Sequence, residues 1–404
     1  MNLLLATVTV LIGATVWSGD GPPRPDQRVM LRGERIAAIG PALEIPEDAE
    51  VIDLQGAIVT PGLVDPASTL GLVELTTGEP SAREGTLGGA DADPIRAALR
   101  AADTFDPRAL AVPVARREGI TSAVVLPYGG VVAGQAAWVS LVDREPVRRD
   151  EAALVVSVHG ARSKAGSRSR GFLLLREALE DARLYRAPGN RGAYIRRSLR
   201  ELAPSAKDLE PLARTLEGEL KILVQVDRAS DILTVLEIAR DQKLDAILLG
   251  VREGWRVADA IARARVPVIV NPIANLPEDF DSLESREDNA ERLRAAGVRV
   301  AFMTPGPPTL EGRLRLTAGN AVARGYPRDA ALAAITSVPA EIFGMPDEGR
   351  LRAGARADLV VWNGDPFEPL TWATRMFIAG RPVDLETRQE LLTERYRDGS
   401  PGAP

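Results

Sequence analysis

Short apolar runs that recur through the middle of the chain constrain the fold more than any other feature. They occur at residues 121–127, 153–159, 221–227, 245–250, 266–271 and 298–304. Runs of this length, rich in branched side chains, are typical of parallel strands that are buried on both faces. Several precede helical periodicity, as where Ile232, Val235 and Leu236 share one face behind Ser230, the expected helix N-cap. Repeated strand–helix units over about 250 residues predict an α/β fold, a (β/α)8 TIM barrel.

The two ends of the chain have a different pattern, with short strands separated by turns. Residues 29–40 read as a hairpin with Gly33 at the turn, and residues 50–56 as a further strand that ends in glycine. Residues 354–366 and 376–383 repeat this character. Residues 3–17 are apolar, but the stretch is shorter than the roughly 20 residues of a membrane span. No Lys or Arg precedes Arg24, so we interpret this segment as strand rather than as a signal peptide.

Three stretches carry a family resemblance. Residues 58–71 read Ile-Val-Thr-Pro-Gly-Leu-Val-Asp-Pro-Ala-Ser-Thr-Leu-Gly, a strand followed by a Pro-Gly turn and a loop. Residues 224–232 read Val-Gln-Val-Asp-Arg-Ala-Ser-Asp-Ile, and residues 354–366 contain Ala-Asp-Leu-Val-Val-Trp. From about Val10 to about Val383 the chain resembles the metal-dependent amidohydrolase superfamily, and its imidazolonepropionase-like members in particular.

The resemblance implies a domain organisation. Both chain ends would combine into a small composite β-sandwich beside the TIM barrel. Residues 1–57 and 344–384 would supply the sandwich, residues 58–343 the barrel, and residues 385–404 a C-terminal helix and tail. Residues 160–170 read as a mobile loop, and helical segments from 171 to 202 as an insertion before the fifth strand.

The resemblance also implies where a metal site would lie, and other residues stand at those positions. Relatives carry His-x-His after the first strand, two histidines after the fifth, one after the sixth, and an aspartate after the eighth. The matching residues here are Ala67, Thr69, Gln225, Asp227, Gly250 and Pro305. The chain has one histidine, His159, and no cysteine, so imidazole and thiolate ligands cannot come from elsewhere in the sequence. We therefore expect no metal cofactor and loss of the superfamily's metal-assisted hydrolysis.

Carboxylates near the expected strand ends leave an alternative open. Asp65, Asp227 and Glu253 can bind a hard divalent cation such as Mg²⁺ or Ca²⁺, or transfer protons if burial shifts their pKa values. The competing interpretation is that Asp65 and Asp227 cap loops or pair with arginines. His159 ends the expected fourth strand, where it is either a rim residue or a general base.

Further polar residues can line the barrel mouth: Gln225, Arg252, Asn271, Asn275 and Gln135. Gln135 closes a glycine-rich segment, residues 129–135, that either brings backbone N–H groups to a ligand or forms a tight turn. It lacks the Gly-Lys-Ser/Thr ending of a phosphate-binding loop.

Composition limits the partners. The net charge of −6 gives no support for nucleic-acid binding, and we expect no membrane span. The compartment is open: cytoplasmic as the sequence stands, periplasmic if a longer leader was removed. Two functional hypotheses follow. The first is a degenerate amidohydrolase that binds a small-molecule ligand, or associates as a homo-oligomer or with an active relative. The second is an active C–N bond hydrolase with a carboxylate-based or metal-independent site.

Overall fold

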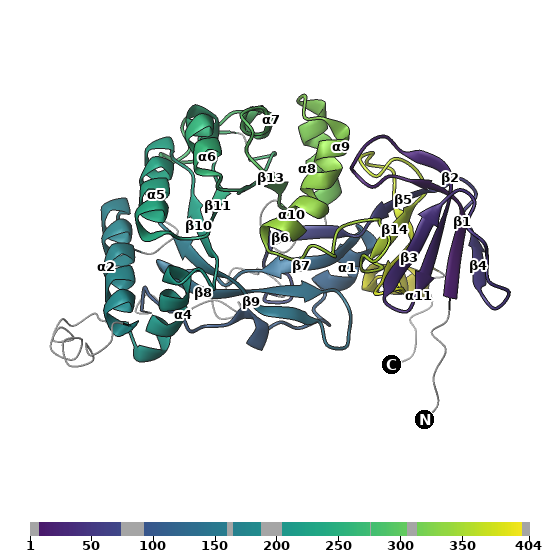
Figure 1. Ribbon diagram of the computed structural model, residues 1–404, viewed down its shortest axis with the longest axis horizontal. Coiled ribbons are helices and arrows are strands. Elements are labelled where there is room, and N and C mark those ends of the chain that lie inside the picture. The colour runs from purple at the N-terminus through teal and green to yellow at the C-terminus, as the bar shows by residue number, and fades with distance from the viewer. Residues whose placement is uncertain are drawn as a thin grey trace.

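The computed structural model describes residues 8–73, 93–159, 165–186, 204–274, 276–304 and 313–397. Two sheets organise these residues (Figure 1): a barrel sheet in the middle of the chain and a second sheet, here sheet A, made from both chain ends. No helix among the described residues has the length and apolar content needed to cross a membrane.

The barrel sheet has eight strands in the order β13-β12-β11-β10-β9-β8-β7-β6. Its edge strands β13 and β6 contact each other, so the sheet is nearly closed. Backbone pairing is parallel from β9 to β13 and between β6 and β7. This confirms the expected TIM-barrel class. The strands are β6 Leu63–Ser68, β7 Ile120–Val125, β8 Val132–Ser140, β9 Val147–Ser157, β10 Ile222–Val226, β11 Ala246–Gly250, β12 Val268–Val270 and β13 Val300–Phe302.

One barrel strand departs from the expected strand–helix repeat. β8 runs antiparallel to both β7 and β9, and the three strands follow one another without an intervening helix. The sequence interpretation placed a glycine-rich loop over residues 129–135, but the strand already begins at Val132. Gly134, at φ +131°, lies where the β8–β9 register shifts, and an added Cβ would come 2.6 Å from the Leu99 carbonyl oxygen. Glycine at this position therefore allows a bulged strand to pack closely against residues 93–103.

Helices cover the outside of the barrel (Figure 1). They are α1 Ala111–Arg117, α2 Arg168–Arg186, α4 Ala206–Leu216, α5 Ala229–Gln242, α6 Ala258–Ala264, α7 Asn289–Ala295, α8 Leu314–Ala323 and α9 Arg328–Ala334, with the short turns η2 Ala101–Asp103 and η3 Gly254–Val257. α2 begins inside the segment expected to be a loop, and residues 187–202 of the expected insertion lie outside the described residues. Ser230 was expected to be the N-cap of α5, and this prediction is wrong. Arg228 holds that position, and the Glu253 carboxylate accepts the first N–H of the helix.

The barrel interior is a separate apolar core. Alternate strand residues such as Val64, Val124, Leu223 and Ile269 meet there. Helix α10, Ser337–Ile342, and Phe343 add side chains to the same core. Trp138 packs edge-on against Phe343, with ring centroids 6.1 Å apart. A barrel filled in this way is a packed core, so chemistry is confined to its ends.

Sheet A confirms that the two chain ends combine. Its order is β16-β15-β14-β5-β1-β2-β3, with β4 paired to β1. The strands are β1 Val8–Val16, β2 Arg24–Arg32, β3 Arg35–Gly40, β4 Glu50–Asp53, β5 Ile58–Pro61, β14 Leu359–Trp362, β15 Ala373–Ile378 and β16 Arg381–Pro382. β5 pairs with β1 and β14, so sheet A extends to Pro61 and the chain passes into the barrel at Gly62. The domain boundaries at residues 57, 343 and 384 stay predictions.

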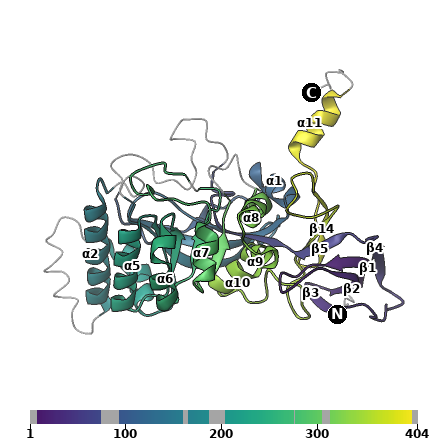
Figure 2. The ribbon, with the colours of Figure 1, turned by 90° about the horizontal axis from the view of Figure 1, so that it is seen from above.

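The last described helix, α11 Arg388–Tyr396, stands out from the body of the chain (Figure 2). Thr387 and Glu390 form a capping box at its start, which satisfies backbone N–H groups that the helix leaves unpaired. None of its residues is buried.

Candidate functional site at the barrel mouth

The carboxyl ends of the parallel strands bring the candidate residues to one end of the barrel, here called the mouth. Asp65 lies in β6, His159 follows β9, Asp227 follows β10 and Glu253 follows β11. All four are buried, at 1–5% exposure. Ionisable side chains so deeply buried need specific partners, and those partners indicate what each residue can do.

Asp65 is the carboxyl group whose protonation is most strongly perturbed at the mouth. Burial raises its pKa to about 6, opposed by hydrogen bonds from the Thr304 side chain and from the N–H groups of Ala67 and Thr304. Oδ1 accepts the two N–H groups at 3.2 and 3.5 Å. Oδ2 is buried and has no partner of ordinary hydrogen-bond geometry among the described residues, with the Thr304 hydroxyl close by. A group that titrates near neutrality can hold or release a proton at the mouth.

Asp65→Asn is expected to stabilise the chain at pH 8 by about 1–3 kcal/mol. The folded pKa lies above the unfolded value of 3.8, so the folded state binds the additional proton. Stability from this group is present below about pH 4 and is lost as the pH rises to about 6. Urea unfolding at pH 5 and pH 8 measures this, and the gain over wild type should shrink at pH 5. The exposed Asp20→Asn is the matched control. An equal effect at both pH values would contradict the assignment.

Asp227 is tied to the turn after β11. Its Oδ1 accepts the N–H of Arg252 at 3.4 Å, and its Oδ2 lies 4.0 Å from the Arg252 Nε. Gly250 has φ +95°, and a Cβ added there would lie 2.3 Å from the Asp227 Oδ1. Val251 follows at φ +53°, a conformation that a β-branched residue rarely adopts. The Asp227 carboxylate therefore occupies space that a side chain at position 250 would need.

Glu253 holds two backbone segments together. Its Oε2 accepts the N–H of Ala229 at 3.0 Å, at the start of α5, and its Oε1 accepts the N–H of Glu284 at 3.1 Å. A carboxylate at a helix N-terminus is electrostatically favoured. Both oxygens are thus engaged in fixing the start of α5 and the segment that precedes α7.

His159 faces that same segment, which runs from β12 to α7. Its Nε2 lies 3.4 Å from the Asp279 Oδ2 and 3.6 Å from the Asp281 Oδ2. Arg228 lies 3.4 Å from Asp281 and also donates to the Phe280 carbonyl oxygen. The Phe280 side chain itself is 80% exposed. The histidine therefore lies beside the acidic side chains of this segment, and Arg228 pairs with one of them.

Two more arginines hold the same region. The Arg252 Nη1 lies 2.8 Å from the Glu278 Oε2. The Arg168 Nε lies 3.8 Å from the Asp281 Oδ1, while the same guanidinium binds both oxygens of Asp231 in α5. The sequence interpretation missed Asp279, Asp281 and Arg168 as site residues. A signal for these residues was present in the sequence. Residues 278–284 are rich in acidic side chains, and Arg228 and Arg252 follow strands, so ion pairs between them could have been predicted.

The structure describes most of the remaining predicted site positions. Gln225 is half-buried in β10. Gln135 is buried and donates to the Ala97 carbonyl oxygen at 2.9 Å, while Asn271 accepts the N–H of Ile273 at 3.0 Å. Ala67 is buried and Thr69 half-buried at the end of β6. Asn275 and Pro305 lie outside the described residues. These placements leave the site residues as predictions.

The described residues contain no group of three or more His, Asp or Glu side chains placed to hold a metal ion. The candidates have other partners: Asp227 contacts Arg252, Glu253 binds two N–H groups, and His159 faces two aspartates. In chemical terms the arrangement offers one proton-binding carboxyl, Asp65, and a network of ion pairs.

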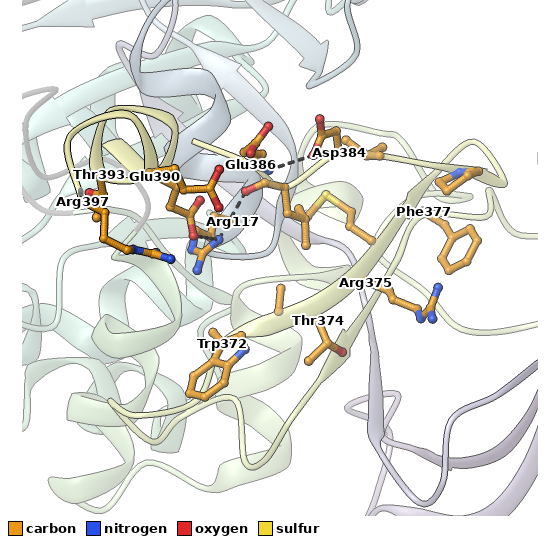
Figure 3. Close-up of a pocket in the computed structure, with 16 residues that line it drawn as sticks. Arg117, Trp372, Thr374, Arg375, Phe377, Asp384, Glu386, Glu390, Thr393 and Arg397 are labelled. Carbon is orange, nitrogen blue, oxygen red and sulfur yellow. Dashed lines mark hydrogen bonds and ion pairs between the residues drawn. The ribbon is translucent and has the colours of Figure 1, made fainter. Parts of the chain in front are cut away.

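A groove of about 760 Å³ lies away from the mouth, between α11 and β15 (Figure 3). In its lining, the Arg117 Nη1 lies 2.6 Å from the Glu390 Oε1, and Trp372 is a further lining residue. No residue of α11 is buried, so this groove differs from the buried residues of the mouth.

Comparisons with known proteins agree with this architecture. Residues 298–370 match the family model described as "Amidohydrolase family". The chain is 27% identical to an imidazolonepropionase of Anaeromyxobacter dehalogenans (strain 2CP-C), over 91% of this chain and 92% of that protein. A solved amidohydrolase from Thermotoga maritima MSB8 superposes with a TM-score of 0.83 at 25% identity, covering 93% of this chain and 99% of that one. The chain belongs to the amidohydrolase superfamily.

Two further comparisons show how far the likeness extends. "Amidohydrolase tasK" of Hapsidospora irregularis is 24% identical over 81% of this chain, which spans about a third of that longer protein (36%). The solved molinate hydrolase has a TM-score of 0.56 at 17% identity, covering 95% of this chain and 96% of that one, which supports the fold alone. The shared fold does not by itself determine which reaction, if any, the barrel mouth carries out.

Proposed function

We propose that this amidohydrolase-superfamily chain has lost the metal site and acts without metal-dependent hydrolysis, as a protein that binds a small-molecule ligand or a partner chain. The observation that carries the proposal is the packing of Asp227 against Gly250. In the superfamily pattern described above, both positions belong to histidine ligands. Here a side chain at 250 would collide with the Asp227 carboxylate, and φ +95° already disfavours any side chain there.

The donor chemistry supports the same proposal. Ala67, Thr69 and Gly250 offer no imidazole, and the single His159 faces the aspartates of the β12–α7 segment. A catalytic zinc site in proteins commonly needs three nitrogen or oxygen ligands around an open position. Asp227 and Glu253 would have to leave their present partners to supply two of them. If the chain binds a protein partner rather than a small molecule, that partner would be a second copy of this chain or an active relative.

Metal content is the first test. Protein purified without a histidine tag or chelators, from cells grown with added zinc, is expected to hold well under about 0.1 transition-metal ion per chain, because the donor set lacks three convergent ligands. Inductively coupled plasma mass spectrometry gives the number. A stoichiometric transition metal would overturn the proposal.

The alternative is a C–N bond hydrolase that uses Asp65, Asp227 or Glu253, with or without a hard divalent cation. The shifted pKa of Asp65 is the observation in its favour. A panel of cyclic amides and N-acyl amino acids, with and without Mg²⁺ or Ca²⁺, separates the two proposals. Turnover that Asp65→Asn or Asp227→Asn abolishes without lowering the melting temperature would establish the alternative.

A further inference from the structure

A second cavity lies at the opposite end of the barrel from the mouth. Its volume is about 210 Å³, the share of about seven water molecules. Glu34 comes from the turn between β2 and β3, Arg35 is the first residue of β3, and Arg148 comes from the start of β9. Glu348 and Arg356 come from the segment between α10 and β14. The cavity therefore sits where sheet A meets the amino-terminal ends of the barrel strands.

Glu348 is the most deeply buried of these residues, with its side chain 4% exposed. Its Oε2 accepts hydrogen bonds from the Ser122 hydroxyl at 3.0 Å and from the Trp138 Nε1 at 2.8 Å. Its Oε1 is also buried but has no hydrogen-bond partner among the described residues. A buried carboxylate oxygen without a donor is costly, so this atom favours a ligand that brings one.

Arg148 covers that oxygen without bonding to it. Its Nε lies 3.7 Å from the Glu348 Oε1, too far for a hydrogen bond, and its side chain is 41% exposed. By contrast, Arg356 is fixed by both oxygens of Asp358, at 3.1 and 3.0 Å, and Arg35 is held by Asp347 at 3.2 Å. Arg148 is therefore the arginine of this cavity that can turn at little cost.

We propose that this cavity binds a small zwitterion, with its ammonium group on the Glu348 Oε1 and its carboxylate on the Arg148 guanidinium. An α-amino acid with a small side chain has both groups and a size suited to the cavity. An ammonium supplies the donor that Oε1 lacks, and a guanidinium binds a carboxylate with two parallel hydrogen bonds. The proposal goes beyond the function of the barrel mouth and requires no metal there.

Isothermal titration and thermal unfolding with glycine, L-alanine, L-serine and L-proline test the proposal. At least one is expected to bind and to raise the melting temperature by a few degrees at saturation. Acetate and methylammonium, each with one of the two charges, are expected to bind at least about tenfold more weakly, because each makes only half of the contacts.

Two variants assign the binding to this cavity. Arg148→Gln and Glu348→Gln should each weaken binding at least about tenfold. Arg148→Gln changes an exposed side chain and should leave the melting temperature of the unliganded chain nearly unchanged. Arg144→Gln, exposed in the β8–β9 connection, is the matched control and should bind as wild type does. If none of the four amino acids binds, or if both variants bind as tightly as wild type, Arg148 and Glu348 form a structural ion pair only. Either result would overturn the proposal.

Discussion

Arg356→Met is expected to lower the free energy of unfolding by about 3–5 kcal/mol at pH 8. Arg356 is 8% exposed, and its Nε lies 3.0–3.1 Å from both oxygens of Asp358, which is 2% exposed. Its Nη2 also donates to the Ser140 hydroxyl at 3.3 Å. Methionine retains the apolar volume but leaves Asp358 buried beside Glu348 without its cation. Breaking one side of a buried ion pair costs more than the pair itself contributes.

The loss should depend on pH. Burial raises the pKa of Asp358 to about 6; Arg356 lowers it and Glu348 raises it. Because the folded pKa lies above the unfolded value of 3.8, stability from this group is present below about pH 4 and falls as the pH rises through 6. Without Arg356 the folded pKa rises further, so the penalty continues to grow above pH 6. The loss should therefore be smaller at pH 5 than at pH 8.

Urea unfolding of the variant at both pH values measures the effect. Arg352→Met is the matched control, because that arginine is 56% exposed and 3.8 Å from Asp347, and surface pairs contribute at most about 1 kcal/mol. Arg356→Lys should fall between wild type and Arg356→Met, since lysine keeps the charge but has a single nitrogen in place of the Nε that contacts Asp358 and the Nη2 that donates to Ser140. A loss that is equal for Arg352→Met and Arg356→Met would contradict the role assigned to the buried pair.

Gly250→Ala is expected to destabilise the chain by about 2–4 kcal/mol. One part is backbone strain at φ +95°, and the other is the 2.3 Å approach of the new Cβ to the Asp227 Oδ1. Gly297→Ala is a matched control for the first part. Gly297 has φ +88° and no atom within 4 Å of an added Cβ. The difference between the two losses isolates the steric contact with Asp227.

A double-mutant cycle tests that contact. Asp227→Ala in the Gly250→Ala background should recover about 1–2 kcal/mol relative to the sum of the single changes, because it removes the clashing carboxylate. Chemical denaturation of the four proteins gives the coupling. Additive losses would show that Asp227 does not limit what position 250 can carry, and would remove the main support for the proposed loss of the metal site.

Apart from β8, the strands of the barrel and of sheet A could be predicted from the sequence, because continuous branched runs and turn glycines are local signals. For β8 the sequence interpretation gave a glycine-rich loop over residues 129–135, and neither the strand nor its direction was predicted. Val132–Ser140 is apolar like its neighbours, and a strand that is buried on both faces carries no pattern that distinguishes parallel from antiparallel pairing. The cap of α5 was wrongly predicted at Ser230, because the group that satisfies its first N–H is Glu253, 24 residues away in sequence.

The places of the candidate residues in the fold could be predicted, but their partners could not. Asp65 lies in β6, and His159, Asp227 and Glu253 follow the carboxyl ends of β9, β10 and β11. Their environments depend on segments far along the chain, as where Thr304 binds Asp65 and Asp281 faces His159. Glu348 was missed altogether, because its partners Ser122 and Trp138 come from strands more than 200 residues earlier.

The pairing in sheet A has a consequence for co-translational folding. β5 pairs with β14, and the paired residues Pro61 and Leu359 are about 300 residues apart. At roughly 5–20 residues per second, a ribosome needs about 15–60 s to supply β14 after β5 has emerged. Until then β5 has an unpaired edge, and such edges promote pairing with other nascent chains. The barrel strands lie between β5 and β14 in the sequence and can pair before β14 is made. Sheet A can therefore be completed only after nearly the whole chain has been synthesised.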